Sequence, residues 1–110
     1  MKLKTVLILV AMMSIVLCLA LPQVAVADDG AGLYKAKCAM CHGADGAGKP
    51  AAKIPSLIAD DAKKATDAAL TDDIANGGAD KKASHAFQTK GLTPDQINMI
   101  VSYIRNLQKK

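Results

Sequence analysis

Two cysteines and a histidine stand close together in this chain, at a spacing that can do chemistry. The segment is Cys38-Ala39-Met40-Cys41-His42, so the thiols are three residues apart and the imidazole directly follows the second. On a helix, side chains three residues apart lie on the same face. Both thiols can therefore form thioethers with two vinyl groups on one edge of a porphyrin, and His42 can bind its iron. The pattern predicts covalent attachment of a c-type haem.

Two other interpretations use the same residues. A Cys-x-x-Cys pair can be the site of a haem-free thiol–disulfide oxidoreductase, which normally lies between a strand and a helix. No strand pattern flanks Cys38 or Cys41. A structural zinc site needs four ligands, and apart from His42 and the carboxylates only His85 remains as a typical one. The haem interpretation is favoured over both.

The elements that must position this motif read as helices joined by loops. A first helix is predicted from Asp28 to Cys41, with acidic residues at its start and apolar residues at three- and four-residue steps. A loop rich in glycine and proline follows over residues 43–55. A short helical turn is predicted over residues 57–62, and a second helix over 66–76, which Gly77 ends.

The last predicted helix has the clearest start signal. Thr93 is its N-cap, Pro94 its first residue, and Gln96 completes a Thr-x-x-Gln capping box. The apolar stripe that follows comprises Ile97, Ile100, Val101, Ile104 and Leu107. Because no segment alternates as a half-buried strand would, the fold class predicted is all-α.

The N-terminal segment is set apart from this domain. Lys2 and Lys4 precede an apolar run over residues 6–21, and the small residues Ala25 and Ala27 stand where a signal peptidase cuts. Residues 1–27 are therefore predicted to be a secretory signal peptide, cleaved after Ala27. The alternative is a retained membrane anchor, which needs about 20 apolar residues.

Attachment as a lipoprotein through Cys18 is disfavoured. The peptidases of that pathway require a small residue directly before the cysteine, and Leu17 occupies that position. Cys18 is therefore interpreted as one more apolar residue of the leader. Contact with a membrane is expected only through this leader, before the leader is cleaved.

The composition of residues 28–110 excludes several classes of function. The whole chain has fourteen basic and ten acidic residues, and two of the basic ones, Lys2 and Lys4, belong to the leader. The remaining net charge of +2 is interspersed, and the aromatic residues are only Tyr34, Phe87 and Tyr103, so a nucleic-acid partner is not expected. A domain this small and poor in large side chains often needs a cofactor to complete its core.

The motifs resemble those of small bacterial class I cytochromes c with one haem. Gly30, Tyr34, the Cys-x-x-Cys-His-Gly segment and Asp45-Gly46-x-Gly48 are similar to the opening of that family. Residues 92–97, followed by Val101, Tyr103, Ile104 and Leu107, are similar to its closing helix, so the resemblance covers the domain 28–110. It implies three to four short helices wrapped around one covalent haem c, with the N- and C-terminal helices crossing near Gly30.

The resemblance also implies roles for two residues of the central loop. Pro55-Ser56-Leu57 matches the family's Pro-x-Leu segment, in which the proline carbonyl accepts a hydrogen bond from the proximal imidazole and the leucine lines the haem. Such a bond would fix the tautomer of His42 and raise its basicity. Pro50 is a nearby alternative to Pro55.

The sequence departs from the family at the distal iron ligand. Most relatives have a Met-x-Ala-Phe type segment before the closing helix, whereas this chain has Ser84-His85-Ala86-Phe87. The methionines outside the leader, at positions 40 and 99, are poorly placed to substitute. We hypothesise that His42 and His85 are both iron ligands. The alternative is a surface His85, with iron five-coordinate or water-bound.

The function implied is electron transfer by a monomeric periplasmic protein that is not an enzyme. Redox proteins would dock transiently at the haem edge, oriented by lysines at positions 37, 49, 53, 81 and 82. Two imidazole ligands would give a lower potential than a methionine ligand does. The alternative function is a haem-based ligand binder or sensor, or a small peroxidase, either of which needs an open distal site.

Overall fold

The computed structural model describes residues 2–19 and 29–110, and its N-terminal part is a single helix, α1 (Lys2–Leu19). The side chains of residues 2–11 of this helix are exposed, including those of Leu3 and Leu7. None of the helices in the described residues is long and apolar enough to cross a membrane. The predicted cleavage position at Ala27 lies outside the described residues.

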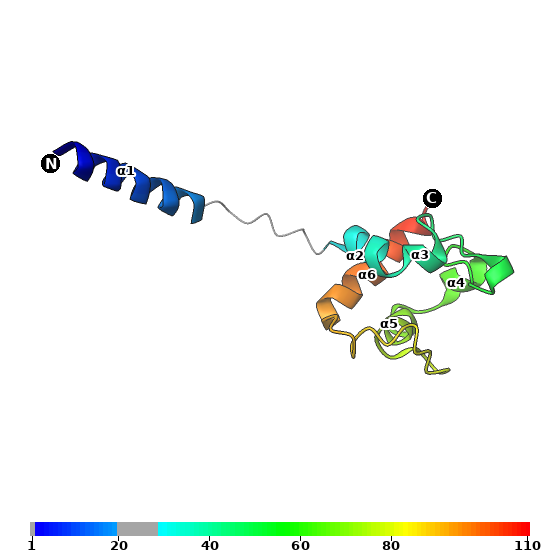
Figure 1. Cartoon of the computed structure of the whole chain (residues 1–110). Helices are drawn as coiled ribbons and strands as arrows, with labels where there is room; N and C mark the ends of the chain where they lie inside the picture. The colour runs from blue at the N-terminus through cyan, green and yellow to red at the C-terminus, as the bar shows by residue number, and fades with distance from the viewer. Residues whose placement is uncertain (1, 20–28) are drawn as a thin grey trace.

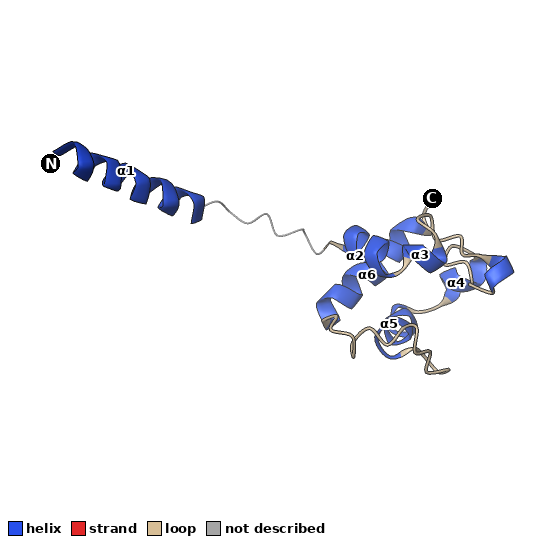
Figure 2. Cartoon of the chain, viewed as in Figure 1, coloured by secondary structure: helices blue, strands red, loops and turns tan. Residues whose placement is uncertain are grey.

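Residues 29–110 fold into short helices joined by loops (Figure 1). The helices are α2 (Gly30–Lys37), α3 (Ala39–His42), α4 (Asp60–Lys64), α5 (Asp67–Asn76) and α6 (Pro94–Leu107), with a 3₁₀ turn η1 (Pro50–Ala52). In the described part of the chain no strand forms, and the only strand-like pairing there is an isolated bridge between Lys49 and Ile54 (Figure 2). The all-α prediction is confirmed.

The predicted continuous helix from 28 to 41 was wrong at Cys38. Asp29 caps α2 by accepting a hydrogen bond from the Gly32 amide at 2.6 Å, and the helix ends at Lys37. Cys38 has φ −119°, which is far from the helical value of about −63°. The chain then re-enters a short helix, α3, in which the amide of His42 donates to the carbonyl of Cys38 at 2.9 Å. This break raises the number of helices above the three to four expected.

The short helix predicted over 57–62 lies three residues later, as α4. Asp60 and Asp61 occupy its first turn and Lys63 and Lys64 its last, which matches the polarity of the helix dipole. Leu57 and Ile58 precede the helix and pack, half-buried, against the core. Apolar contact therefore holds these residues in a bent, non-helical segment, and the helix begins at the charged residues that follow.

The crossing of α2 and α6 forms the centre of the domain. A Cβ added to Gly30 would collide with the Met99 carbonyl oxygen and lie 3.1 Å from the Cβ of Tyr103, so only glycine permits this close approach. The rings of Tyr34 and Tyr103 lie 5.1 Å apart between centroids, and Ile100 is fully buried. The predicted capping box of Thr93 and Gln96 is present at the start of α6.

Candidate functional site

One cavity of about 450 Å³ brings together all six residues predicted to hold or line a haem: Cys38, Cys41, His42, Pro55, Leu57 and His85. They come from α2–α3, from the central loop and from the loop between α5 and α6. The volume is within the range of roughly 300–1,000 Å³ of small-molecule and cofactor sites. Segments far apart in the sequence therefore converge on one site.

The proximal side is built from α3 and the segment around Pro55. His42 is 9% exposed, and its Nδ1 lies 3.1 Å from the carbonyl oxygen of Pro55. A carbonyl can only accept, so Nδ1 carries the proton and donates, which leaves Nε2 with a free lone pair. Pro55, and not Pro50, is the proline in this contact.

Gly48 allows the two loops of this side to come together. Its φ is +74°, and a Cβ there would lie 2.6 Å from the carbonyl oxygens of both Ile54 and Pro55. Its amide donates to the His42 carbonyl at 2.8 Å. A side chain at position 48 would push the Pro55 carbonyl away from His42, so this glycine contributes to fixing the imidazole.

The two thiols differ in their surroundings. Cys38 is 9% exposed, whereas Cys41 is exposed, and both are free. Burial, followed by the neighbouring Cys41, raises the pKa of Cys38 to about 11. Reactive thiols in redox enzymes have lowered pKa values because the thiolate is the nucleophile. The environment of Cys38 is therefore unlike that of a thiol–disulfide oxidoreductase.

His85 lies across the cavity from His42. The centroids of the two rings are 6.1 Å apart, with 35° between their planes. Burial, followed by the nearby His42, lowers the pKa of His85 from its ordinary value, although Asp73 opposes the shift. His85 is thus held neutral at pH 7, with a lone pair available to a metal.

The geometry of the two imidazoles fits a metal ion between them. With centroids 6.1 Å apart, His42 and His85 would be able to hold one metal ion through metal–imidazole bonds of about 2.0–2.1 Å. The Nδ1 of His85 is buried and has no hydrogen-bond partner among the described residues. Buried polar atoms are rarely left unpaired, so a bound group is expected to complete the site at this ring, although Asp73 also interacts with it. The residues present fit a haem with two axial histidines.

Neither methionine outside the leader is placed to ligate an ion in this cavity. Met40 is 82% exposed and Met99 is 44% exposed, and neither lines the cavity. Ser84, which occupies the position expected for methionine, does line it. His85, the residue proposed as the distal ligand, has its ring centroid 6.1 Å from that of His42.

The rest of the lining was only partly visible in the sequence. Ile104 was predicted as part of an apolar stripe, and Leu70 and Ile74 fall in the predicted helix 66–76, but none was predicted as a wall of this site. Asp73 was not predicted as a site residue, because no motif includes it. Lys37, Lys53 and Lys82 also line the cavity, whereas Lys49 is engaged elsewhere, donating to the Met40 carbonyl at 2.7 Å.

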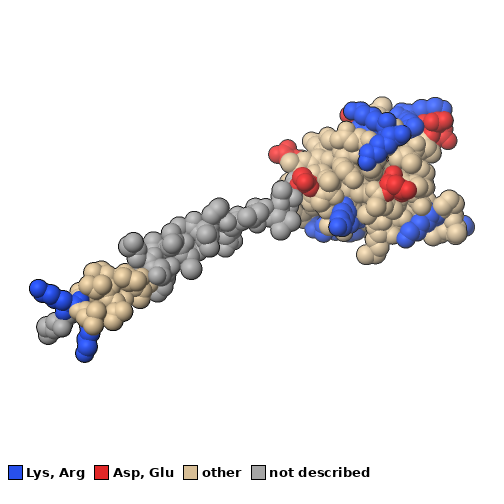
Figure 3. Space-filling view, turned by 90° about the horizontal axis from the view of Figure 1, so that it is seen from above, with Lys and Arg blue, Asp and Glu red and all other residues tan. Residues whose placement is uncertain are grey.

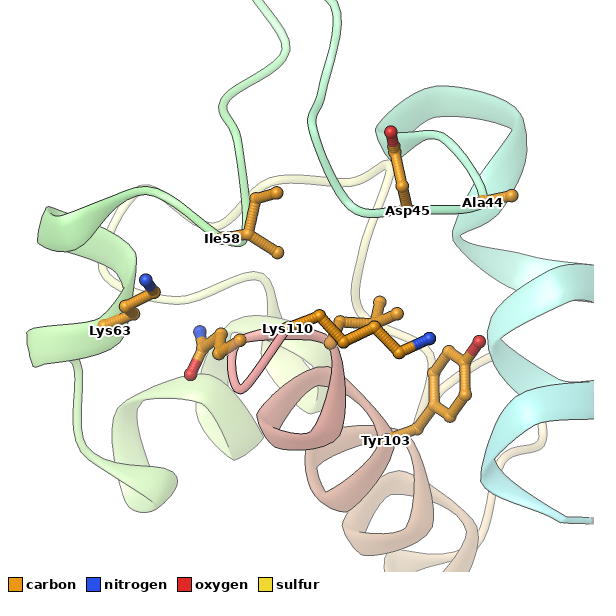
Figure 4. A pocket seen from close by; sticks show the side chains of 8 residues that line it. Ala44, Asp45, Ile58, Lys63, Tyr103 and Lys110 are labelled. Carbon is orange, nitrogen blue, oxygen red and sulfur yellow. The ribbon is translucent and has the colours of Figure 1, made fainter.

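A second hollow of about 380 Å³ lies near the C-terminus (Figure 4). Its lining mixes apolar side chains, such as Ile58 and Leu107, with Lys63, Asp45 and Tyr103, and contains none of the predicted site residues. Across residues 2–19 and 29–110 there is no group of three or more histidines, cysteines and carboxylates that could hold a metal ion. The zinc interpretation therefore has no support in the described structure.

The helical fold and the paired imidazoles define a class of small domains built around a metal-bearing cofactor. A family model described as Cytochrome c matches residues 27–108. The chain belongs to the cytochrome c family. No curated protein matches the chain.

Membership of this family identifies the chain as a haem-binding protein of electron transfer. The family implies covalently bound haem c and generally interacts with redox partners. Its members are generally electron carriers and not enzymes.

Proposed function

We propose that this protein is an exported carrier of single electrons, with one haem c held by Cys38 and Cys41 and ligated by His42 and His85. The observation that carries the proposal is the pair of imidazoles 6.1 Å apart across a cavity that both thiols line. When bound, the haem iron supplies one-electron chemistry by alternating between its ferric and ferrous states.

The chain's own residues keep both axial positions fixed. His42 is oriented by its Nδ1–H bond to the Pro55 carbonyl, which fixes its tautomer and makes its other nitrogen a better donor. His85 is kept neutral by burial, so it need not lose a proton to serve as a ligand. With two protein ligands, no external ligand has to enter or leave during electron transfer, which suits a carrier.

A low midpoint potential follows from this ligand pair. Imidazole is a better donor than thioether sulfur, and it stabilises the ferric state that methionine ligation disfavours. Leu57, Leu70 and Ile74 make part of the cavity wall apolar, which limits solvent access. With this ligand pair, the midpoint potential of the protein should be lower than that of its methionine-ligated relatives.

Transient docking to acidic redox partners is part of the proposal. Lys37, Lys53 and Lys82 line the cavity in which the exposed Cys41 lies, so positive charge adjoins the expected haem edge. Figure 3 shows basic and acidic side chains interspersed over the visible face of the domain, without a large field of one sign. Weak electrostatic orientation of this kind speeds encounter without tight binding.

We further propose that residues 1–27 direct export and are removed after Ala27, leaving a monomeric periplasmic protein. This rests on the basic start of the leader, its apolar helix α1 and the small residues before position 28. Haem attachment of this type takes place after export, so the leader and the Cys-x-x-Cys-His motif belong to one pathway.

The test uses the full chain, expressed in a host that attaches haem to exported proteins. Intact-mass analysis should give residues 28–110 plus one haem, and a redox titration should show one electron per chain. The ferric and ferrous spectra should be low-spin, and the ferrous protein should bind carbon monoxide slowly. Rapid binding of one carbon monoxide per chain would instead favour a ligand-binding, sensor or peroxidase function.

A matched pair of variants locates the distal ligand. His85→Ala should give high-spin iron and fast carbon monoxide binding, because it leaves the sixth position without a protein ligand. Lys81→Met alters an exposed residue of the same loop and should behave as the wild type. A low-spin His85→Ala protein with an unchanged spectrum would show that His85 is not a ligand.

A further inference from the structure

The loop that carries His85 is fastened by one lysine further along the chain. Lys90 donates from its Nζ to two successive carbonyl oxygens, at 2.8 Å to Ala83 and at 3.1 Å to Ser84. These are the two residues directly before His85. Hydrogen bonds from a charged donor are stronger than neutral ones, so both carbonyls are held toward a single side chain.

The same ammonium group also contacts the aromatic residue after His85. Lys90 Nζ lies 4.9 Å from the centroid of the Phe87 ring, a cation–π distance. The ring of Phe87 is stacked on that of His85, with 6.4 Å between their centroids and 27° between their planes. Lys90 therefore reaches both sides of the proposed ligand, through the backbone before it and through a ring that stacks on it.

Apart from the packing of Phe87 against the core, few backbone hydrogen bonds tie this part of the loop to the domain. The amide of His85 donates only to the nearby Lys82 carbonyl, at 3.1 Å. The nearest backbone bond to a helix runs from the Phe87 amide to the Ile74 carbonyl, at 2.9 Å. Ala86 has φ +54°, a left-handed conformation that is unfavourable for a residue other than glycine. A loop with this strain needs contacts that keep it closed.

We propose that Lys90 is a positioning residue that holds His85 at the iron by clamping the loop at Ala83 and Ser84. This rests on the proposed ligation by His85 and extends it to the residue that sets how often the ligand leaves. Lys90 touches neither the cavity nor His85 itself, so its effect is on the lifetime of the closed loop. Lys90 thereby controls the rate at which His85 dissociates from the iron.

The rate at which His85 leaves the iron can be measured directly in the ferrous holoprotein. When carbon monoxide is saturating, the observed binding rate reaches a plateau equal to the rate at which the internal ligand dissociates. Lys90→Met removes the charge and all three donors while keeping the length of the side chain. We expect its plateau rate to rise roughly tenfold, as the loss of two charge-assisted hydrogen bonds at an exposed site allows.

Three further variants separate the clamp from a simple change of charge. Lys81→Met removes the same charge from the same loop, at a residue with no contact to these carbonyls, and should stay within about twofold of the wild type. Lys90→Arg keeps the charge and the donors and should restore most of the slow rate. Lys90→Gln keeps a neutral donor, so its plateau rate should lie between those of the wild type and Lys90→Met. It also serves as the neutral variant if Lys90→Met yields no holoprotein. Equal denaturant midpoints would show that global stability is unaffected.

The outcomes separate this inference from the function on which it rests. If wild-type ferrous protein shows no plateau, and binding rises linearly with carbon monoxide, ligation by His85 is wrong. If the wild type has a plateau that neither neutral Lys90 variant raises beyond that of Lys81→Met, His85 is a ligand but Lys90 does not position it. A raised plateau in both neutral variants, with rescue by arginine, supports the clamp.

Discussion

The two sides of the cavity hold their imidazoles by different means. His42 lies in a hydrogen-bonded helical turn, directly next to the cysteines, and its ring is tied to the Pro55 carbonyl at 3.1 Å. His85 lies in a loop between α5 and α6 that contains two non-glycine residues with positive φ, Lys81 and Ala86. No hydrogen bond of the described structure holds the buried Nδ1 of its ring.

This difference indicates how the proposed iron site would combine a rigid half with an adjustable one. His42 is held by regular backbone bonds and a buried environment, so substitutions beside it should change stability more than the proposed ligation. His85 depends on closure of its loop, so single side chains there should change how often it would bind the iron. Proteins generally unfold locally in segments that have few buried contacts. Five predictions test the contrast, beginning with the largest effect.

Loss of both thiols should abolish the covalent cofactor. In the double variant Cys38→Ser, Cys41→Ser no thioether can form, and the cavity of about 450 Å³ is left without its anchor. Intact-mass analysis and haem staining after denaturation should show no attached haem. Cys18→Ser, in the leader, is the matched control and should keep one haem per chain. Covalent haem in the double variant would contradict the proposed attachment.

His85→Met should raise the midpoint potential by roughly 0.1 V or more, within the span of about 0.8 V over which axial ligands set haem potentials. The sulfur ligand favours ferrous iron, whereas imidazole favours ferric iron. A potentiometric titration measures the change. Lys81→Met places the same side chain elsewhere in the loop and should move the potential little. If both variants kept the wild-type potential, the distal ligand would have to be another group.

Tyr34→Phe should lower the free energy of unfolding by about 1 kcal/mol. The Tyr34 hydroxyl donates to the Gly43 carbonyl at 2.8 Å, directly after His42, and the variant leaves that carbonyl without this partner. Denaturant titration measures the loss, while the spectrum of the haem should stay unchanged. Tyr103→Phe is the control, because its hydroxyl has no hydrogen bond among the described residues. An equal loss in the two variants would show that the bond from Tyr34 to Gly43 does not contribute.

The same tyrosine should give the protein an alkaline pH dependence. Burial, followed by the nearby Cys38, raises the pKa of Tyr34 from 10.0 to about 12. The unfolded chain therefore loses this proton first, so stability falls as the pH rises from 10 toward 12 and is unaffected below that range. Tyr34→Phe should show a shallower decline in unfolding titrations over this interval. An identical slope in both proteins would exclude the contribution.

Ala86→Gly should stabilise the distal loop slightly, by about 0.5 kcal/mol. Relief of the left-handed strain at φ +54° exceeds the entropy that glycine adds to the unfolded chain, but only by a little. Ala83→Gly, in the same loop without a positive φ, pays the entropy alone and should be destabilised by a similar amount. Denaturant midpoints of the two holoproteins decide this, and a midpoint for Ala86→Gly below that of Ala83→Gly would oppose the interpretation.

The sequence predicted correctly those parts of the fold that depend on residues close together in the sequence. The capping box of Thr93 and Gln96 is a local signal, and α6 begins where it indicates. The helix predicted over 66–76 begins one residue later, as α5, with Thr66 as its N-cap. The break at Cys38 has no local signal, because neither glycine nor proline stands there. It arises in the packed domain, where Cys38 is buried and Met40 points to solvent.

The candidate site likewise contains residues that a local motif predicts and residues that depend on tertiary contacts. Cys38, Cys41 and His42 form one short motif, so their chemistry can be inferred without a structure. Asp73 and Lys90 act through contacts between segments, and nothing in their sequence neighbourhood distinguishes them from other charged surface residues. Short motifs therefore predict which groups hold a cofactor, whereas the groups that support the second ligand become visible only in three dimensions.

In the proposed holoprotein, the imidazoles of His42 and His85 bind one iron from opposite sides. Near-infrared magnetic circular dichroism of the ferric holoprotein tests it most directly, because the charge-transfer band of low-spin haem shifts with the pair of axial ligands. We predict one low-spin species with a band at the position of a bis-imidazole haem. A band at the position of a histidine–methionine pair, or a high-spin spectrum, would contradict the assignment of His85.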